Sequence, residues 1–428
     1  MTLSVGERPH QRALLLAIET PHKDWEESLA ELALLAETAG VEVVDTITQK
    51  RNRPDPVYFV GKGKAHEIRP IKGETEADVL LVDGELRPSQ QRNLEEAANM
   101  GVLDRTALIL DIFARRARSG EGKIQVELAQ LEYLLPRLAG KGTDLSRLGG
   151  GIGTRGPGET KLEVDRRRVR ARIRLLKEQV EQIEKRRSIE RRHRQDAGIP
   201  VVALVGYTNA GKSTLLNALS DASVFVEDLL FATLDPTIRR LQLREGREVL
   251  VSDTVGFIRN LPHQLVAAFR ATLEEVVESD LLVHVVDASH RHMRDQIEAA
   301  RRVLAELGCA DKPTIMAFNK IDLVTDQEPV AQLASQEAPG VLISARTGEG
   351  FDVLLRLISE RLEQDLTAVE LTVPWSAQDL VSEAHQRGRV LAEDFVEEGV
   401  ALTARVPDDI AQRLRRAAGL EEPKTEDW

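Results

Sequence analysis

The sequence predicts a multidomain α/β protein whose central domain is a doubly wound sheet. At 428 residues the chain exceeds the size of a typical single domain. In two stretches, apolar runs of strand length alternate with helical periodicity, which is typical of α/β domains. A polar, helix-like stretch separates them. From these changes of pattern we place domain boundaries at residues 1–113, 114–197, 198–366 and 367–428.

The first domain, residues 1–113, is expected to contain a small, mostly parallel sheet. Its alternating pattern of strands and helices is the one that parallel sheets require. Predicted strands span residues 12–18, 41–44, 78–83 and 107–113, and predicted helices span 25–38 and 89–100.

The second domain, residues 114–197, is expected to be a helical hairpin with a long glycine-rich tip. Two sets of apolar residues recur at spacings of 4, 3, 4 and 3, which predicts two helices packed side by side. Pro136 is expected to kink the first helix near its end. Residues 140–160 between the helices are too rich in glycine for helix or strand. The two sets are Ile124, Leu128, Leu131, Leu135 and Leu138, and Val169, Ile173, Leu176, Val180 and Ile183.

Charge is distributed unevenly along the chain. The net charge of -12 argues against indiscriminate nucleic-acid binding. Residues 161–196, however, hold 14 basic and 7 acidic residues, so this segment is +7 and the rest is -19. Composition alone fits two interpretations equally: arginines that follow an RNA backbone, or a solvated helix face beside a flexible linker. The arginines concerned are Arg166, Arg167, Arg168, Arg170, Arg172 and Arg174.

Other features of the composition exclude several classes of protein. A single cysteine, Cys309, rules out an internal disulfide, and no Cys or His cluster has zinc-site spacing. No apolar run approaches the ~18 residues of a membrane span, and the first residues lack the pattern of a signal peptide. We therefore expect a cytoplasmic protein. His290 and His292 are interpreted as exposed loop residues rather than as a metal pair.

A phosphate-binding loop is predicted at the start of the third domain. It follows an apolar strand at 200–205 and precedes a helix, as a P-loop must. Lys212 is expected to reach the terminal phosphates and Ser213 to bind Mg²⁺, while backbone amides cradle the phosphates. The loop comprises Gly206, Tyr207, Thr208, Asn209, Ala210, Gly211, Lys212 and Ser213.

Two further segments are expected around the phosphates. Asp253, Thr254, Val255 and Gly256 follow an apolar strand at 249–252, so that Asp253 holds Mg²⁺ through water and Gly256 approaches the γ-phosphate. Thr233 is the second hydroxyl expected on Mg²⁺, and with Lys212 and Gly256 it forms the predicted catalytic set. The switch segment consists of Phe231, Ala232, Thr233, Leu234 and Asp235.

The nucleotide base is predicted to be guanine. An ionised Asp322 can accept the ring N–H and exocyclic amine of guanine together, whereas adenine offers no N–H at that ring position. A buried carboxylate here would reject ATP by about 10⁴-fold or more. The two base-binding boxes are Asn319, Lys320, Ile321 and Asp322, which follow a strand at 314–318, and Ser344, Ala345 and Arg346, which follow a strand at 341–344. The predicted ligands are therefore GTP and Mg²⁺.

Two residues bear on hydrolysis. Some GTPases place a glutamine after the Asp-x-x-Gly glycine to orient water, but here that residue is Phe257. We therefore expect slow hydrolysis by the isolated chain. Asn209 occupies a P-loop position at which asparagine accompanies potassium recruitment, which suggests K⁺ as an additional cofactor and faster turnover in potassium than in sodium.

The last domain, residues 367–428, is predicted to be a small α+β unit. Its pattern is a strand at 369–373, a helix at 377–386, a β-hairpin at 389–396 and 400–406, and a helix at 408–418.

Over essentially its whole length the chain resembles the HflX family of translational GTPases. The resemblance depends on the segments 149–163, 231–237 and 253–257, of which the first is the most specific. It implies a ribosome-stimulated GTPase that binds the large ribosomal subunit and its RNA. It also implies splitting of stalled or idle ribosomes under stress, with the glycine-rich tip reaching towards the peptidyl transferase centre.

The resemblance also bears on individual residues and leaves alternatives. An apolar residue at Phe257 agrees with the family, and the arginine-rich helix is then interpreted as an RNA contact. Some members bind ATP through the N-terminal domain, but this sequence contains no second P-loop. We expect a monomer. Two alternatives are a GTPase of ribosome assembly or tRNA modification, and a signalling switch that does not bind RNA.

Overall fold

The computed structural model describes most of the chain and divides it into two compact units. The described residues are 11–21, 24–138, 161–196, 199–220, 230–231, 237–243, 248–259, 270–337, 339–363 and 366–420. Unit 1 comprises Met1–Glu184, Glu227–Asp235 and Arg259–Thr272, and unit 2 comprises Lys185–Val226, Pro236–Ile258 and Leu273–Trp428. Within these ranges, no helix combines the length and apolar character needed to cross a membrane.

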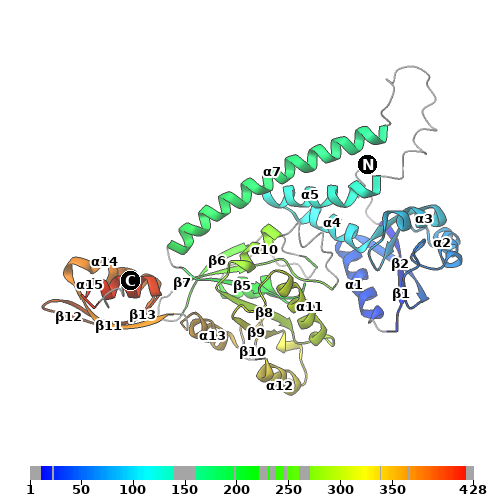
Figure 1. Ribbon diagram of the computed structural model, residues 1–428. Coiled ribbons are helices and arrows are strands. Elements are labelled where there is room, and N and C mark those ends of the chain that lie inside the picture. Colours follow the sequence, from blue (N-terminus) through cyan, green and yellow to red (C-terminus); the bar gives the residue numbers. More distant parts are fainter. Residues whose placement is uncertain are drawn as a thin grey trace, which may run out of the picture. The chain divides into compact units, whose positions relative to one another are not determined.

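The N-terminal sheet of unit 1 is fully parallel, as predicted, with the strand order β2-β1-β3-β4 (Figure 1). Its strands are β1 (Gln11–Glu19), β2 (Val41–Lys50), β3 (Val79–Val82) and β4 (Gly101–Asp104). Its helices are α1 (Trp25–Thr38), α2 (Lys62–Thr75), α3 (Pro88–Ala98) and α4 (Arg105–Arg116). Helices α2 and α3 bury Ile68 and Leu94 against Leu14, Leu16 and Leu80, which forms one hydrophobic core.

The predicted strand at 107–113 is wrong, because these residues lie within α4. Asp104 caps this helix, accepting a hydrogen bond from the Ala107 backbone N–H at 2.9 Å. Nearly all of the segment is buried, and a short, mainly apolar run fits a strand or a buried helix equally well. The fourth strand is instead β4, whose four residues are too few to show a period.

Two helices form the predicted hairpin, α5 (Gly120–Arg137) and α7 (Lys161–Asp196). Arg172 makes two 2.7 Å hydrogen bonds to Glu127, and Lys177 pairs with Glu132 at 2.9 Å, so the helices lie side by side there (Figure 1). Leu176 is fully buried. Pro136 occupies the last turn of α5. The glycine-rich tip, residues 140–160, lies outside the described residues.

The larger sheet of unit 2 has six strands in the order β10-β9-β8-β5-β7-β6. All neighbours are parallel except β6, which is antiparallel to β7 and was not predicted. The strands are β5 (Val201–Val205), β6 (Thr237–Gln242), β7 (Glu248–Asp253), β8 (Leu281–Asp287), β9 (Thr314–Asn319) and β10 (Gly340–Leu342).

Helices cover both faces of this sheet, as expected for a doubly wound fold. Leu215 of α8 and Leu354 of α13 pack in one core, while Ile297 of α11 and Leu333 of α12 pack in the other. The helices are α8 (Lys212–Leu219), α10 (Arg270–Val277), α11 (Met293–Glu306), α12 (Glu328–Gln336) and α13 (Phe351–Glu363).

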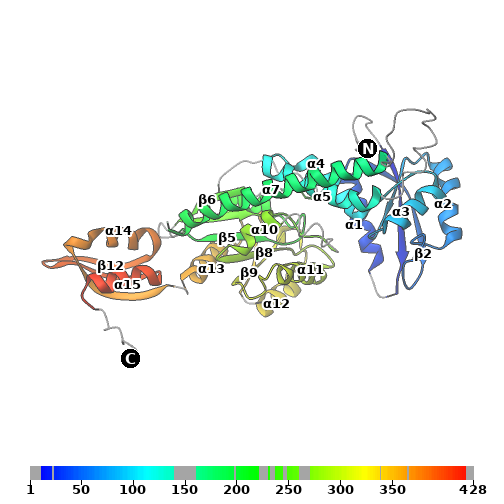
Figure 2. The same cartoon turned by 45° about the horizontal axis from the view of Figure 1, so that its top comes forward.

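The C-terminal residues form a three-stranded antiparallel sheet, β11-β13-β12, with α14 and α15 on one face (Figure 2). This is the predicted α+β pattern. The strands are β11 (Thr367–Pro374), β12 (Arg389–Val396) and β13 (Gly399–Val406), and the helices are α14 (Gln378–Arg387) and α15 (Asp408–Ala417). The four domain boundaries stay a prediction.

Candidate nucleotide-binding site

The predicted P-loop joins the end of β5 to the start of α8. Gly211 caps α8 with a left-handed φ of 94°, and a Cβ at this position would lie 2.3 Å from Nδ2 of Asn319. Both the backbone conformation and the close approach therefore require glycine. The helix begins at Lys212, so its free N–H groups lie beside the loop, where they favour an anion.

The Lys212 side chain folds back on the loop itself. Its Nζ donates to the carbonyl oxygens of Gly206 at 3.0 Å and Tyr207 at 2.9 Å. Burial lowers the pKa of Lys212 to about 8, although the nearby carboxylate of Asp253 favours the charged form. To bind phosphate, the ammonium group must exchange these carbonyls for phosphate oxygens.

Ser213 and Asp253 bring two oxygen ligands together beside the loop. The Ser213 hydroxyl donates to Oδ2 of Asp253 at 2.6 Å, and Asp253 is buried at the end of β7. A hydroxyl and a carboxylate are hard oxygen donors of the kind that Mg²⁺ prefers, so these residues fit the ion. Thr233, predicted as the second hydroxyl ligand, lies outside the described residues together with Ala232, Leu234 and Asp235.

The segment that follows β7 pairs with the P-loop backbone. The Phe257 N–H donates to Gly206 O at 3.0 Å, and the Thr208 N–H donates to Phe257 O at 2.7 Å. A Cβ on Gly256 would lie 2.7 Å from Cα of Thr208, so only glycine permits this approach. Phe257 is 1% exposed, and it offers no polar side-chain group for positioning water.

Thr254 and Val255, predicted to contact the nucleotide, are both buried. The Thr254 hydroxyl donates to the carbonyl oxygen of Leu204 at 2.7 Å, and so links the end of β7 to β5. This bond assigns the Thr254 side chain a structural role.

The base-binding boxes lie at the ends of β9 and β10 and are joined by Asn319. Its amide nitrogen donates to Ala210 O and its amide oxygen accepts from Ala345 N, both at 2.8 Å. Asn319 is 1% exposed, so each of these bonds is buried. The side chain of Asn319 therefore links its own box to the P-loop and to the second base-binding box.

Other residues of the boxes are held by side-chain pairs. The Ser344 hydroxyl donates to Oδ1 of Asp322 at 2.7 Å, which orients the carboxylate. Asp322 is exposed rather than buried as the sequence suggested, so its remaining acceptor positions are open to solvent. Lys320 Nζ pairs with Asp287 at 2.8 Å. Ile321 is buried and Arg346 is exposed.

Asp287 was missed as part of the site. Asp287 ends β8, which pairs with β9. Because parallel strands end at one edge of a sheet, this position could have indicated that Asp287 lies beside the Asn319 box. Its ion pair with Lys320 was not predictable from spacing.

Phe231, the first residue of the predicted switch segment, and Arg259 both pack within unit 1. The Phe231 ring meets the Phe113 ring edge-on, with centroids 4.7 Å apart, and both side chains are buried. Arg259, two residues after Phe257, pairs with Glu27 of α1 at 2.6 Å. Nothing in the sequence indicated either contact, because the partners are more than 100 residues apart.

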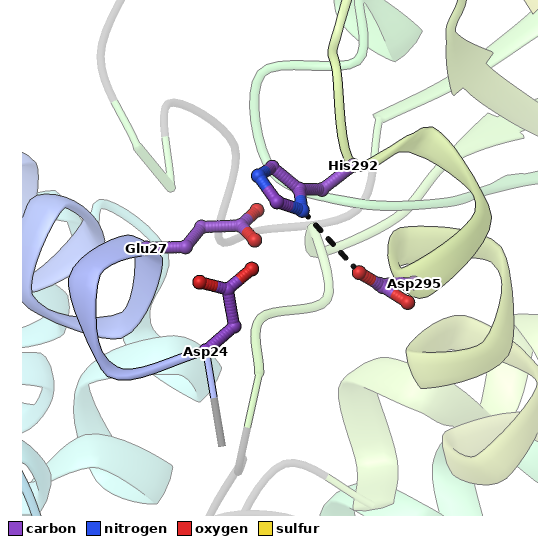
Figure 3. A group of neighbouring side chains, drawn as sticks. All are labelled: Asp24, Glu27, His292 and Asp295. Carbon is purple, nitrogen blue, oxygen red and sulfur yellow. Dashed lines mark ion pairs between the residues drawn. The ribbon is translucent and has the colours of Figure 1, made fainter. Parts of the chain in front are cut away.

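His284 lies within β8, and His290 and His292 follow this strand. His284 lies in β8 opposite Val205, where burial lowers its pKa to about 3, helped by the charges of Arg301 and Lys212. His292 pairs with Asp295 at 3.4 Å (Figure 3), and His290 Nδ1 accepts the His292 N–H. His290 and His292 are partly buried, not exposed as expected.

Models of known protein families match most of the chain. Four family models follow one another along it: a GTP-binding GTPase N-terminal model, a GTP-binding GTPase middle-region model, a 50S ribosome-binding GTPase model and an HflX C-terminal domain model. They match residues 26–114, 116–194, 201–320 and 329–428, respectively.

Curated relatives cover almost the same length. The chain is 50% identical over 408 residues to the GTPase HflX of Caldanaerobacter subterraneus subsp. tengcongensis, an alignment that covers 95% of this chain and 94% of that protein. It is 47% identical over 400 residues to the GTPase HflX of Escherichia coli, covering 93% and 94%. A crystal structure of a GTP-binding protein from Sulfolobus solfataricus in complex with GDP matches with 26% identity and a TM-score of 0.45, covering 82% of this chain and 98% of that one.

Proposed function

Because the chain belongs to the HflX family of GTPases, we propose that it binds the large ribosomal subunit and splits stalled or idle ribosomes under stress. The chain is a GTPase. The observation that carries the ribosomal part is the match of residues 201–320 to the 50S ribosome-binding GTPase model. This work would take place in the cytoplasm.

The hairpin α5–α7 supports contact with ribosomal RNA. Arg167, Arg168, Arg170 and Arg174 are exposed on α7, where they can neutralise phosphates. Arg172 binds Glu127 of α5 and so contributes to the pairing of the two helices. The proposed RNA contact therefore depends on the other four arginines and on the glycine-rich segment 140–160.

The proposed nucleotide site uses residues of the P-loop and of both base-binding boxes. Lys212 and the loop amides would hold the phosphates, Ser213, Thr233 and water-linked Asp253 would hold Mg²⁺, and Gly256 would approach the γ-phosphate. Bound Mg²⁺ would neutralise charge on the phosphates. The Asp322 carboxylate, oriented by Ser344, would accept the two donors of guanine. We also propose that Asn209 recruits K⁺ beside the phosphates.

Sedimentation of purified ribosomes tests the function. Incubation with the chain and GTP should convert monosomes to subunits, and incubation with GDP should not. A chain that lacks residues 149–158 should bind GTP normally and split poorly. If monosomes stay intact, a role in ribosome assembly or tRNA modification replaces the proposal, and if ribosomes are not bound at all, a signalling role replaces it.

A further inference from the structure

The C-terminal α+β domain exposes two aromatic rings to solvent. Trp375, directly after β11, stacks on Phe395 of β12 with ring centroids 6.1 Å apart and planes within 2°. Trp375 is 47% exposed and Phe395 is 70% exposed. The indole Nε1 also donates to the carbonyl oxygen of Glu397 at 3.2 Å. This aromatic stack, Trp375 with Phe395, is therefore held in place although it is exposed.

The position of the stack explains why no part of the described domain covers it. Phe395 lies opposite Val400, a buried core residue, and so belongs to the sheet face on which α14 and α15 pack. It lies near the turn of the hairpin, on the edge strand β12. Single exposed apolar residues are common, but a preorganised aromatic pair is typical of the anchor residues of a protein interface.

Carboxylates lie next to Phe395 in the sequence. Residues 390–400 contain four acidic residues and no basic one. Glu393 pairs with His385 at 2.7 Å, whereas Asp394, Glu397 and Glu398 are exposed and make no ion pair with any residue that the structure describes. Two nearby arginines of this domain are paired with other carboxylates, Arg387 with Asp409 and Arg413 with Glu383. Glu397 and Glu398, here called the acidic rim, therefore keep their negative charge, whereas Asp394 lies opposite Ala401 and so on the other face of the sheet from Phe395.

We propose that the aromatic stack and the acidic rim form a docking surface for a basic protein. The partner would place an apolar side chain against the rings, with positively charged residues on either side of it. The inference relies on the proposed function for the source of this partner, which is a protein of the large ribosomal subunit. Aromatic rings can also stack on RNA bases. The two uncompensated carboxylates of the rim would, however, repel the adjoining phosphates, so the charge favours protein.

Site-specific cross-linking identifies the class of partner. Phe395 of the full chain is replaced by the photoreactive residue benzoylphenylalanine, and the protein is bound to purified large subunits with a non-hydrolysable GTP analogue and irradiated. The adduct should survive ribonuclease and be lost to protease. The same residue at Thr372, exposed on β11 away from the stack, should give no such adduct. An RNA adduct overturns the inference, as does the absence of any adduct on subunits to which the protein is bound.

Affinity measurements test the same surface independently. Trp375→Ala and Phe395→Ala should each weaken binding to large subunits by about tenfold or more, as expected for anchor residues. Glu397→Gln with Glu398→Gln should have a smaller effect that disappears at high salt. Normal GTP binding by each variant serves as the folding control.

The outcomes separate this inference from the proposed function. If the unmodified chain binds subunits and the aromatic variants bind equally well, only the docking surface is wrong. If the unmodified chain does not sediment with subunits, the proposed function and this partner are both wrong.

Discussion

The guanine end and the phosphate end of the nucleotide site differ in how they are held. At the guanine end, Asn319 and Ser344 hold the loops and Asp322 by bonds within unit 2. At the phosphate end, Lys212 binds carbonyls of its own loop, and Phe257 pairs with the loop backbone. The residues proposed for base recognition are therefore preorganised, whereas the proposed phosphate binding requires Lys212 to change partners. The same difference predicts that base identity is read without a partner and that efficient hydrolysis needs one.

The largest effect is expected from Asp322→Asn at the guanine end. An asparagine amide cannot accept both guanine donors, so GTP affinity should fall by about 10³-fold or more. Affinity for xanthosine triphosphate, which presents a carbonyl in place of the amine, should rise. Fluorescent-nucleotide titration measures both. Asp311→Asn, at an exposed carboxylate outside the site, is the control and should bind GTP normally. Equal GTP affinity in the two variants would refute the assigned role.

Asn319→Ala should come next, because it removes a link between the two ends. The substitution leaves the buried Ala210 carbonyl and Ala345 N–H without their partner, at a cost of about 1–3 kcal/mol for each group. Urea unfolding followed by circular dichroism should therefore show a loss of about 2–6 kcal/mol of stability. An unchanged unfolding midpoint would mean that the bridge contributes little to the fold.

His284, beneath the phosphate end, makes stability depend on pH. Because its folded pKa of about 3 is below the ordinary 6.5, the unfolded chain binds the extra proton between these values. Stability is therefore full above pH 6.5 and falls on acidification, by about 2 kcal/mol from pH 7 to pH 5. Unfolding of the parent chain and of His284→Gln at both pH values isolates this contribution. If the two proteins lose stability equally, the histidine is not responsible.

The smallest effect is expected at the Arg259–Glu27 ion pair, next to the phosphate end in sequence. Glu27→Gln removes the charged acceptor of a largely buried pair and should cost about 1–2 kcal/mol of stability. It should change GTP hydrolysis while leaving GDP affinity unchanged. Glu26→Gln, in the same turn of α1, is the matched control. Equal hydrolysis rates in Glu27→Gln and in the control would show that the Arg259–Glu27 pair does not influence hydrolysis.

Prediction from the sequence was most accurate where a motif directly follows an apolar strand. The P-loop at 206–213 and the Asn319 box each follow a long apolar strand, so that position and residue type supported one another. Short or ambiguous segments failed: β4 has four residues, β6 carries two adjacent arginines, and residues 107–113 of α4 are mainly apolar. The bonds of Asn319 and Lys212 are tertiary, and spacing along the chain does not reveal which carbonyl a side chain will reach.

Contacts over long sequence distances could not be predicted. The Arg259–Glu27 pair joins residues 232 positions apart, and Phe231 meets Phe113. The charge pattern predicted α7 as a basic helix, but it did not distinguish Arg172, which binds Glu127, from its neighbours. The Asn319–Asp322 motif likewise gave no indication that Asp322 is exposed.

We propose that the large ribosomal subunit completes the phosphate end of the site, and GTP turnover measures this directly. Hydrolysis by the full chain should be slow alone and should rise by at least about tenfold when purified large subunits are added in magnesium and potassium. An equal rate with and without subunits would contradict the account.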